Sequence, residues 1–442
     1  MLRVLIVSPN FPPINAPDVH RVRTALPHFA ASGWEPTVLC VDPAGCDGPL
    51  DPSLADSLPD GLRIIRVMAW DETACRRFGF GQLAYRSLIP LYRAGLRLLR
   101  REHYDVVYFS TTVFLSFALG RLWKGRFGCR VVYDFHDPWY SDDIPYTRDN
   151  APGGWWKYRI DRGLARCLER FALAAADHVI VVSPAYVDML TYRYPRLSPS
   201  MFTVLPFPVT SHDYALAPRP TPSPDAPRGH RWVSVGAYTP TMQPVLEALF
   251  DALAALLERT PEAAGALDLR FVGTDYAPVV RKRVEPQATA RGLGAIVREM
   301  PDRVPYFEAL GLFTASDAIL MLGSTQAGYT ASKLLTCVAS HRPILALFHR
   351  NSLVSDLAAG FPNIFLATFD KSPAEPQFRT RIAAGVDWLL SRPQFDAGAI
   401  DVALSPWSAE ALTRRQCAIF DGLLQPAAQG EPRAEAHPGA AQ

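Results

Sequence analysis

The runs DVVYFS (residues 105–110), RVVYDF (130–135) and HVIVVS (178–183) decide the fold class of this chain. Each run is rich in Val, Ile or aromatic residues and is apolar on both faces, which is typical of strands in a parallel sheet that helices cover on both sides. Amphipathic stretches lie between several such runs, so the first half predicts a doubly wound α/β domain. Its other expected strands are 3–8, 37–41 and 63–67, and its expected helices are 19–31, 84–103, 158–176 and 184–193.

The same alternation restarts in the second half, with expected strands at 231–236, 268–273, 296–300, 317–322, 343–348 and 363–367. Seven prolines fall within residues 206–227, and neither a helix interior nor a central strand accepts that density. The chain therefore predicts two tandem Rossmann-like domains facing a central cleft. The expected parts are a first domain (1–205), an extended Pro-rich linker (206–229), a second domain (230–405), a C-terminal helix (406–425) and a disordered tail (426–442).

The amino-acid composition limits the class of protein and the cellular compartment that we expect. The 442 residues are 49% hydrophobic and 20% charged, with a formal net charge of +2, which favours a globular protein and gives no support to a nucleic-acid binder held by charge. The seven cysteines contain no Cys-x-x-Cys pair, so we expect a reducing cytoplasm and neither a disulfide framework nor a zinc cage. The first apolar run is too short for a signal peptide, and no run reaches the roughly 18 residues that span a membrane.

The turn after the first strand is the first candidate site, because ligands bind beyond the carboxyl ends of parallel strands. It reads SPNFPPINAPDVHRVR (8–23) and contains no Gly-x-Gly-x-x-Gly motif. Asp18 is a candidate N-cap for the helix that follows. Three interpretations stay open: a phosphate cradle, a loop that faces a sugar or acceptor, and plain connection. Asn15 and Arg21 are the polar groups best placed to meet an acceptor.

The second candidate is DFHDPWY (134–140), at the end of a predicted strand. His136 and Asp137 lie where Pro138 stops that strand. An imidazole can donate to a sugar hydroxyl or move a proton near neutral pH. The alternative is a capping aspartate beside a packed histidine, but the position at a strand end favours a functional pair.

The third candidate is GYTASKLL (328–335), which follows the strand DAILML and a loop containing Gly323. Thr330 is expected to cap a helix, with Ser332 and Lys333 in its first turn. Free N–H groups, a hydroxyl and an ammonium would then converge on one point, which suits a diphosphate. Because the field of a helix end contributes only about 0.3–1 kcal/mol, Lys333 would have to supply much of the binding. The alternative is a solvated lysine on an ordinary helix.

Glycines end the first two strands of the second half. Gly236 lies in VGAYTPTMQP (235–244), which includes Tyr238, and Gly273 lies in FVGTDY (271–276). Glycine allows a ligand to approach the backbone closely, and the two positions are equivalent in one sheet. The chain has no Asp-x-Asp pair, the usual carboxylates for a metal-held nucleotide diphosphate, so we expect no metal and no cofactor.

A basic stretch lies between Glu72 and Glu102, where seven arginines occur without any acidic residue. On a helix, four of these arginines would share one face: Arg86, Arg93, Arg97 and Arg100. Such a face could lie on anionic lipid, at about 1 kcal/mol per basic residue, or be the solvated side of a helix that packs on the core. Pro90 argues against one long continuous helix.

Taken together, these segments resemble the GT-B-fold glycosyltransferases, in particular bacterial enzymes of the retaining glycosyltransferase family 4 type. The resemblance covers roughly residues 2–424. It is carried by VLIVSPNFPPINAPDVHRVR (4–23), YDVVYFSTT (104–112), VVYDFHDPW (131–139), ERFALAAADHVIVVSPAY (169–186), VSVGAYTPTMQP (233–244), LRFVG (269–273), VPYFEALGLFTASDAILML (304–322) and YTASKLLTCVASHRPILA (329–346).

The resemblance implies that the second domain holds a nucleotide-sugar donor and that the helix at 408–424 crosses back to the first domain. The implied positions are Gly236, Ser332 and Lys333 at the diphosphate, Gly273 and Thr274 near the donor, Pro301 and Arg303 at the base, and His136 and Asp137 at the transferring sugar. Three positions depart from the family pattern. Residues 15–17 replace a Gly pair, Met242 and Gln243 occupy the place of a basic residue, and Thr336 stands where a Glu commonly grips the donor ribose.

We therefore expect a cytoplasmic glycosyltransferase, of the retaining hexosyltransferase type, that moves a sugar from a nucleotide-diphosphate sugar to an acceptor hydroxyl in cell-surface polysaccharide or glycoconjugate synthesis. Its expected partners are the nucleotide sugar, a glycan, lipid-linked or small-molecule acceptor, and an anionic membrane surface on the inner face of the membrane. Two alternatives stay open: a sugar-nucleotide 2-epimerase of the same layout and, because of Thr336, a catalytically inactive homologue that acts as a binding partner.

Overall fold

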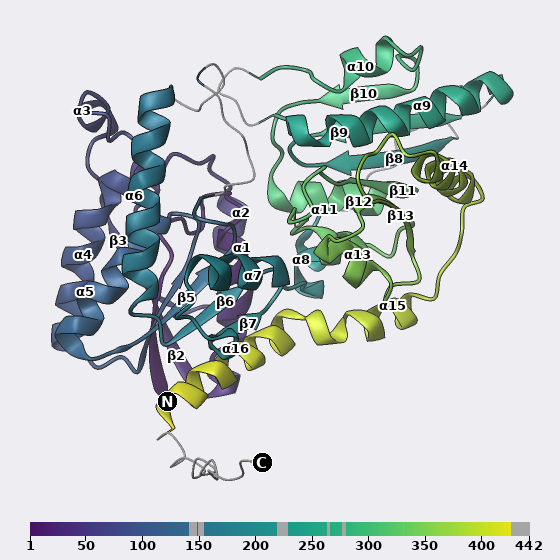
Figure 1. Cartoon of the computed structure of the whole chain (residues 1–442). Helices are drawn as coiled ribbons and strands as arrows, with labels where there is room; N and C mark the ends of the chain where they lie inside the picture. The colour runs from purple at the N-terminus through teal and green to yellow at the C-terminus, as the bar shows by residue number, and fades with distance from the viewer. Residues whose placement is uncertain are drawn as a thin grey trace, which may run out of the picture.

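The computed structural model describes residues 1–140, 148, 154–218, 229–262, 266–275, 280–329 and 331–425. Within these residues the strands form two parallel sheets (Figure 1), one of seven strands in the order β3-β2-β1-β4-β5-β6-β7 and one of six in the order β10-β9-β8-β11-β12-β13. Each order changes direction beside its first strand, as it does in doubly wound folds. The prediction of two tandem Rossmann-like domains is confirmed, while the exact domain boundaries stay a prediction.

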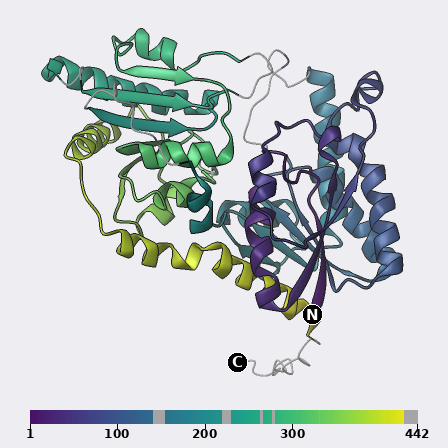
Figure 2. The same ribbon diagram turned by 180° about the vertical axis from the view of Figure 1, so that it is seen from behind.

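The N-terminal sheet consists of β1 (Leu2–Val7), β2 (Trp34–Val41), β3 (Arg63–Val67), β4 (Val106–Ser110), β5 (Arg130–Phe135), β6 (His178–Val181) and β7 (Phe202–Val204). The helices of this half are α1 (Val19–Ala25), α2 (Pro52–Asp56), α3 (Glu72–Arg76), α4 (Leu83–Arg101), α5 (Ala118–Phe127), α6 (Trp155–Leu173) and α7 (Pro184–Arg193). Figures 1 and 2 show α4, α5 and α6 on one face of the sheet and α1 on the other. Because both faces are covered, the central strands are apolar throughout.

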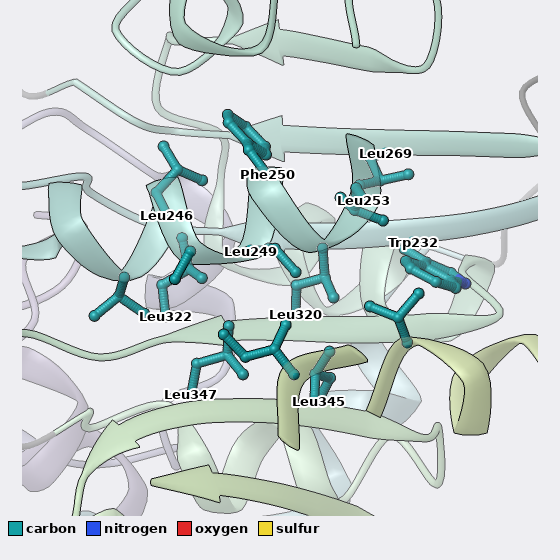
Figure 3. Close-up of a cluster of buried hydrophobic side chains, with 14 of the residues drawn as sticks. Trp232, Leu246, Leu249, Phe250, Leu253, Leu269, Leu320, Leu322, Leu345 and Leu347 are labelled. Atoms are coloured by element: carbon teal, nitrogen blue, oxygen red, sulfur yellow. The ribbon is translucent and has the colours of Figure 1, made fainter. Parts of the chain in front are cut away.

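The C-terminal sheet consists of β8 (His230–Val235), β9 (Leu267–Val272), β10 (Val297–Met300), β11 (Ala318–Leu322), β12 (Ile344–His349) and β13 (Ile364–Phe369). Its helices are α9 (Gln243–Arg259), α10 (Glu285–Thr289), α11 (Tyr306–Ala315), α12 (Leu334–Val338), α13 (Leu353–Ala358), α14 (Pro376–Leu390) and α15 (Ala397–Leu404). Figure 3 shows the apolar side of α9, with Leu246, Leu249 and Leu253, packed on Trp232 and the leucines of the sheet. This contact fixes the sheet whose strand ends carry the candidate donor residues.

Four elements of the N-terminal domain were not predicted from the sequence: the short helices α2 and α3, the helix α5 and the strand β7. The helix α5 contains Gly120, which lowers helix propensity, yet a Cβ at that position would lie 2.4 Å from the hydroxyl oxygen of Tyr133. The glycine is therefore required by the close packing of the helix on the sheet. The strand β7 has three residues, too few for a periodic pattern to reveal.

The connector between the domains differs from the expected extended chain. Residues 211–216 form a short helix, α8 (Ser211–Leu216), and Thr210 caps it by accepting a hydrogen bond from His212 N (3.2 Å). The proline-free stretch between Pro208 and Pro218 is long enough for this turn of helix. The expectation of an uninterrupted extended linker is therefore wrong, and residues 219–228 lie outside the described part of the chain.

The last helix returns to the first domain, as the resemblance implied. It is α16 (Ala409–Leu424), and Ser408 caps it. It packs against α1, and Trp34 Nε1 donates a hydrogen bond to Asp421 (3.0 Å). The predicted disordered tail, 426–442, lies outside the described residues.

Helix α4 runs without a break through Pro90, contrary to expectation. The proline leaves the carbonyl of Arg86 without its helical donor, and Trp70 N donates to that carbonyl instead (3.1 Å). The side chain of Arg86 is buried and donates to the carbonyls of Gly45 and Trp70. The prediction that Arg86 shares an exposed face with Arg93, Arg97 and Arg100 is therefore wrong. In the part of the chain that the structure describes, no helix is both long enough and apolar enough to cross a bilayer.

Candidate active site

Asp134 is a carboxylate inside the apolar strand β5, and polar groups from the neighbouring elements surround it. Its Oδ2 accepts hydrogen bonds from the Tyr108 hydroxyl (2.5 Å) and the Ser110 hydroxyl (3.1 Å), and lies 3.2 Å from Arg21 Nε. Burial alone would raise the pKa of Asp134, but Arg21 and His136 hold it at about 2. A charge within a strand that is apolar on both faces is the sequence signal for this cluster.

His136 is oriented by that carboxylate. Its Nε2 lies 3.2 Å from Asp134 Oδ2 and 3.0 Å from Ser110 Oγ. A proton on Nε2 suits the carboxylate, which leaves Nδ1 as the acceptor of the neutral ring. Nδ1 is buried and has no hydrogen-bond partner among the described residues. The ring also contacts Phe207, with 5.2 Å between centroids, so the imidazole is held firmly and offers one unused acceptor.

Two further carboxylates lie at the same edge of the sheet. Asp137 is exposed directly after His136. Asp18 is buried and accepts hydrogen bonds from Thr111 Oγ1 (3.0 Å) and Thr112 N (3.0 Å), just beyond β4. The prediction that Asp18 caps α1 is wrong, because its side chain makes no capping hydrogen bond and binds these donors instead.

Arg21 and Asn15, the two residues expected on the acceptor side, differ in their surroundings. Arg21 is 3% exposed, and its guanidinium donates to the carbonyls of Leu205 (2.5 Å) and Pro206 (2.8 Å). It ties α1 to the chain that leaves the first domain, which contradicts the expectation that it meets an acceptor. Asn15 reaches the second domain, where its Oδ1 accepts a hydrogen bond from Arg303 (3.0 Å).

Glycines line the matching edge of the C-terminal sheet. Gly236 (φ +121°) and Gly273 (φ +69°) follow β8 and β9 with backbone conformations that favour glycine. A Cβ on Gly236 would lie 3.0 Å from Lys333 Nζ, and a Cβ on Gly273 would lie 3.9 Å from Gly236 N and from Arg303 Cα. The ends of β8, β9 and β10 therefore converge with the loop before α12 on a region of bare backbone.

Lys333 places an ammonium at this region. Its Nζ donates a hydrogen bond to the carbonyl of Val235, and no carboxylate of the described residues forms an ion pair with it or raises its pKa. Burial lowers the pKa of Lys333, against an opposing effect of the Cys337 thiol. Lys333 is half-buried, and an ammonium that is partly removed from water without an anionic partner is costly, so this position favours a bound anion.

The helix behind Lys333 differs from the prediction. Helix α12 begins at Leu334 and has five residues, with Lys333 at the N-cap position and no side-chain cap. Ser332 is exposed and precedes the helix, so its expected place in the first turn is wrong, as is that of Lys333. Thr330, the expected cap, lies outside the described residues. Because α12 is so short, the ammonium rather than the helix field supplies the positive charge here.

Thr274 is less available to a ligand than expected. It is buried and donates a hydrogen bond to Glu299 Oε1 (2.5 Å). The same carboxylate accepts hydrogen bonds from the backbone N–H groups of Arg283, Val284 and Glu285 at 2.8 to 3.1 Å. No sequence motif singles out Glu299, which holds the chain that follows β9 in place.

The other predicted donor residues surround the glycines. Tyr238 is buried, and its hydroxyl accepts a hydrogen bond from Gln287 (3.2 Å). At Gly323 a Cβ would lie 2.7 Å from the Phe348 ring, so this glycine serves packing. Pro301 and Arg303 follow β10, and Arg303 reaches across to Asn15.

Polar contacts join the two domains beside these edges. Asp213 of α8 pairs with Arg23 of α1 (2.5 Å) and accepts a hydrogen bond from the Tyr306 hydroxyl (2.9 Å). Asp51 accepts a hydrogen bond from Tyr306 N (2.8 Å). Phe207, which contacts His136, also lines a small hollow with Ser332 and Leu334 of the second domain. His136 and Lys333 therefore lie on opposite sides of one interface.

The departures from the family pattern have clear places in the structure. Thr336 is half-buried, and its carbonyl accepts a hydrogen bond from the Tyr214 hydroxyl (2.5 Å). Met242 is buried in the core, and Gln243 donates to Glu247 (2.9 Å), so neither supplies a cation. Among the described residues no group of three or more His, Cys, Asp or Glu side chains is suited to a metal ion.

Comparisons with known proteins agree with this arrangement. Residues 19–207 match the family model described as Glycosyl transferase 4-like domain, whereas no curated protein sequence matches the chain. HepE from Anabaena, solved with UDP, is similar over 95% of this chain and 100% of that protein, with a TM-score of 0.61 and 16% identity. The catalytic domain of starch synthase IV from Arabidopsis thaliana, bound to ADP and acarbose, is similar over 96% and 98%, with a TM-score of 0.61 and 11% identity.

A third similar structure comes from Listeria monocytogenes and is assigned as a UDP-N-acetylglucosamine 2-epimerase. It is similar over 95% of this chain and 96% of that protein, with a TM-score of 0.55 and 11% identity. At such identities the likeness establishes the fold. The chain has the two-domain GT-B fold, and its first domain resembles the glycosyl transferase 4-like domain.

Proposed function

We propose that the protein is a glycosyltransferase that moves a sugar from a nucleotide-diphosphate sugar to an acceptor hydroxyl. The observation that carries this proposal is the half-buried ammonium of Lys333, whose described partner is a backbone carbonyl at glycine-lined strand ends. A diphosphate would neutralise that charge, and Gly236 and Gly273 would let it approach the backbone. The family match of residues 19–207 and the similar folds solved with UDP and with ADP support the same assignment.

In this reaction Lys333 stabilises the negative charge that develops on the leaving diphosphate. Such preorganised electrostatic stabilisation is usually the largest single contribution to catalysis, and it is stronger in a buried site than in water. Arg303 lies beside Gly273, where it would meet the nucleotide. Its hydrogen bond to Asn15 couples the donor side to the first domain.

His136 positions the transferring sugar. Because Asp134 takes the proton-bearing Nε2, the free Nδ1 is an acceptor for a sugar hydroxyl. Asp137 is the second polar group at this edge, and its exposure leaves it accessible to the sugar or the acceptor.

The finer assignments follow the resemblance. We place the protein in the cytoplasm, among retaining hexosyltransferases that act on cell-surface polysaccharides or glycoconjugates and need no metal. The anomeric proton coupling in the NMR spectrum of the product would test the stereochemistry. Full activity in the presence of a chelator would be expected, and its loss would contradict metal independence.

A melting screen followed by a transfer assay tests the main proposal. The full chain is heated with UDP, ADP or GDP and with the corresponding nucleotide sugars. A ligand at 100 times its Kd should stabilise the folded state by about 2.7 kcal/mol, which raises the melting temperature by several degrees. The stabilising nucleotide sugar should then donate its sugar to an acceptor. No shift with any nucleoside diphosphate would contradict the proposal.

A sugar-nucleotide 2-epimerase is the second candidate, because the Listeria protein assigned to that activity has a similar fold. An epimerase needs no acceptor. Incubation with the stabilising nucleotide sugar alone should therefore give no epimer if the protein is a transferase, and appearance of the epimer would favour the alternative. Nucleotide binding without either reaction would point to an inactive homologue, consistent with Thr336 in place of a glutamate.

A further inference from the structure

Helix α6 carries an apolar stripe that faces solvent. Trp156, Ile160 and Leu164 are 70%, 68% and 38% exposed. They are spaced four residues apart, so they lie on one side of the helix. Large apolar side chains exposed in a row mark an interaction surface more often than scattered ones do.

The rest of the exposed surface of α6 is strongly basic. Its exposed cationic residues are Lys157, Arg159, Arg162, Arg166 and Arg170. The acidic residues of the helix are Asp161, which is half-buried, and Glu169, which is buried. A helix with an exposed apolar stripe flanked by Lys and Arg has the composition of helices that lie in a membrane interface.

A second apolar segment lies beside α6. Phe78 and Phe80, between α3 and α4, are 78% and 53% exposed. The ring of Phe80 contacts that of Tyr85 at 5.4 Å, and the Tyr85 hydroxyl donates a hydrogen bond to Asp161 of α6 (3.3 Å). Figures 1 and 2 show α3 near one end of α6, at the same end of the first domain. The two segments therefore form one surface, which we call the α6 face.

A groove of about 530 Å³ is lined by residues of this surface and by neighbours of the candidate active site. Thr112, which binds Asp18, and Pro138, which follows Asp137, line it together with Leu164 of the apolar stripe. Most of its other lining residues are aromatic or aliphatic: Ala84, Tyr85, Phe114, Leu115, Trp139, Tyr140, Tyr158, Ala165 and Leu168. The charged and amide side chains that line it are Gln82, Lys157, Asp161 and Arg162.

We propose that the α6 face docks on an anionic lipid bilayer and that the groove admits a lipid-linked acceptor from the bilayer to the strand ends. The apolar side chains enter the interface, and the basic residues pair with anionic headgroups. The membrane contact stands without the proposed function, whereas the acceptor route rests on it.

The α4 arginines offer an internal comparison. Arg93, Arg97 and Arg100 are exposed, but they lie in the second half of α4, and the large apolar residue exposed on that helix is Ile89. Charge without an apolar stripe gives weak, salt-sensitive binding. The structure therefore moves the membrane surface expected from the sequence from α4 to α6.

Vesicle co-sedimentation of the full chain at low salt tests the membrane contact. The probes are phosphatidylcholine vesicles with and without phosphatidylglycerol, and binding is expected with the anionic vesicles. Replacing Lys157, Arg159 and Arg166 together by Gln should weaken it about 100-fold. The double substitution Trp156→Ser and Ile160→Ser should weaken it about tenfold or more. All five side chains are exposed, so the fold should be retained.

Two matched controls distinguish binding through the α6 face from nonspecific binding through positive charge or exposed apolar side chains elsewhere. Arg93→Gln, Arg97→Gln and Arg100→Gln together remove the same charge from α4, and Tyr192→Ser with Val402→Ser removes two other exposed apolar side chains. Both controls should bind vesicles like the unmodified protein. Equal loss in the controls and the α6 variants, or no vesicle binding at all, would overturn the proposal. A change of oligomeric state in the α6 variants, without a change in vesicle binding, would make the face a protein interface instead.

The acceptor route is tested by filling the groove. The substitutions Ala84→Trp and Ala165→Trp are made separately. Each variant should still bind vesicles and should still show the melting shift with the nucleoside diphosphate. Transfer to a lipid-linked acceptor should fall about tenfold or more, on the scale of blocking an apolar site. A retained melting shift shows that the variant is folded and that the donor site is intact. Unchanged transfer in both variants would overturn the route while leaving the proposed function standing.

Discussion

The two sheet edges satisfy their charges in opposite ways. At the N-terminal edge the buried carboxylate of Asp134 has Arg21, Tyr108 and Ser110 as partners within the protein. At the C-terminal edge the half-buried ammonium of Lys333 has a backbone carbonyl as its described partner, beside two glycines. The carboxylate of the first edge therefore has a cationic partner within the protein, whereas the ammonium of the second edge would gain an anionic partner when a ligand binds.

This difference indicates a division of labour. A buried carboxylate that is paired with a guanidinium and hydroxyl groups holds its surroundings rigidly, and here it holds His136. A partly buried charge that lacks an opposite charge lowers the stability of the free protein but makes the energy of pairing available to a ligand. The N-terminal edge therefore positions the reacting sugar, and the C-terminal edge binds the charged part of the donor.

The largest expected effect is on the N-terminal edge. Asp134→Asn should lower the free energy of unfolding by about 3–5 kcal/mol, because it leaves the buried guanidinium of Arg21 without its carboxylate. Urea denaturation monitored by circular dichroism measures this change. Asp137→Asn makes the same substitution at an exposed position of the same edge and should stay within about 0.5 kcal/mol. If the two variants were equally stable, the buried network would not be the structural element described here.

Lys333→Ala should have the next largest effect, on function rather than on stability. We expect turnover to fall about 10²-fold or more, on the scale of losing one donor to a developing negative charge. The melting shift with the nucleoside diphosphate should shrink as well. Removal of a half-buried ammonium that has no anionic partner should leave the stability of the free protein equal or higher. Near-normal transfer by the purified variant would show that the diphosphate binds elsewhere.

The pH dependence of donor binding sharpens the assignment of Lys333. Burial lowers its pKa in the folded protein from the usual 10.5, so it loses its proton at a lower pH than an exposed lysine does. Diphosphate affinity should therefore fall as the pH rises through that lowered pKa, by up to about tenfold per pH unit. The free protein should become more stable over the same range, because the unfolded chain then binds more protons than the folded one.

Calorimetric titration of the nucleoside diphosphate at several pH values measures this dependence. Lys333→Arg is the control, because its guanidinium stays charged throughout the range. The affinity of the arginine variant should depend less steeply on pH. Parallel curves for the two proteins would assign the dependence to another group.

Sequence patterns predicted the central strands of the N-terminal sheet, whose pattern comes from burial on both faces. The strands β4, β5 and β6 are continuous apolar runs because helices cover both sides of the sheet. Helix α5 was missed because Gly120, required by its contact with Tyr133, lowers the helical signal. Helix α8 was missed because the prolines around it predict an extended chain, although the segment between them has room for a helical turn.

The residues of the candidate site also fall into those that the sequence singles out and those that it does not. Gly236, Gly273 and Lys333 could be singled out from the sequence, because glycines at strand ends, and a lysine after a strand and loop, are visible locally. Their role in donor binding stays a prediction. The role of Arg21 was not predictable, because its partners Asp134 and Leu205 are distant in the sequence and meet it only in the folded domain. Glu299 was missed for the same reason, since its ligands are backbone N–H groups that a sequence does not distinguish.

The smallest expected effect concerns Thr274, which the sequence assigned to the donor and the structure joins to Glu299. If its hydroxyl serves Glu299, Thr274→Val should lower the free energy of unfolding by about 1.5–3 kcal/mol, the range for a hydrogen bond to a charged group, and should change the affinity for the nucleoside diphosphate less than about threefold. Thr274→Ser keeps the hydroxyl and should restore most of the stability. The opposite result, a large loss of affinity for the nucleoside diphosphate at unchanged stability, would show that the Thr274 hydroxyl binds the donor.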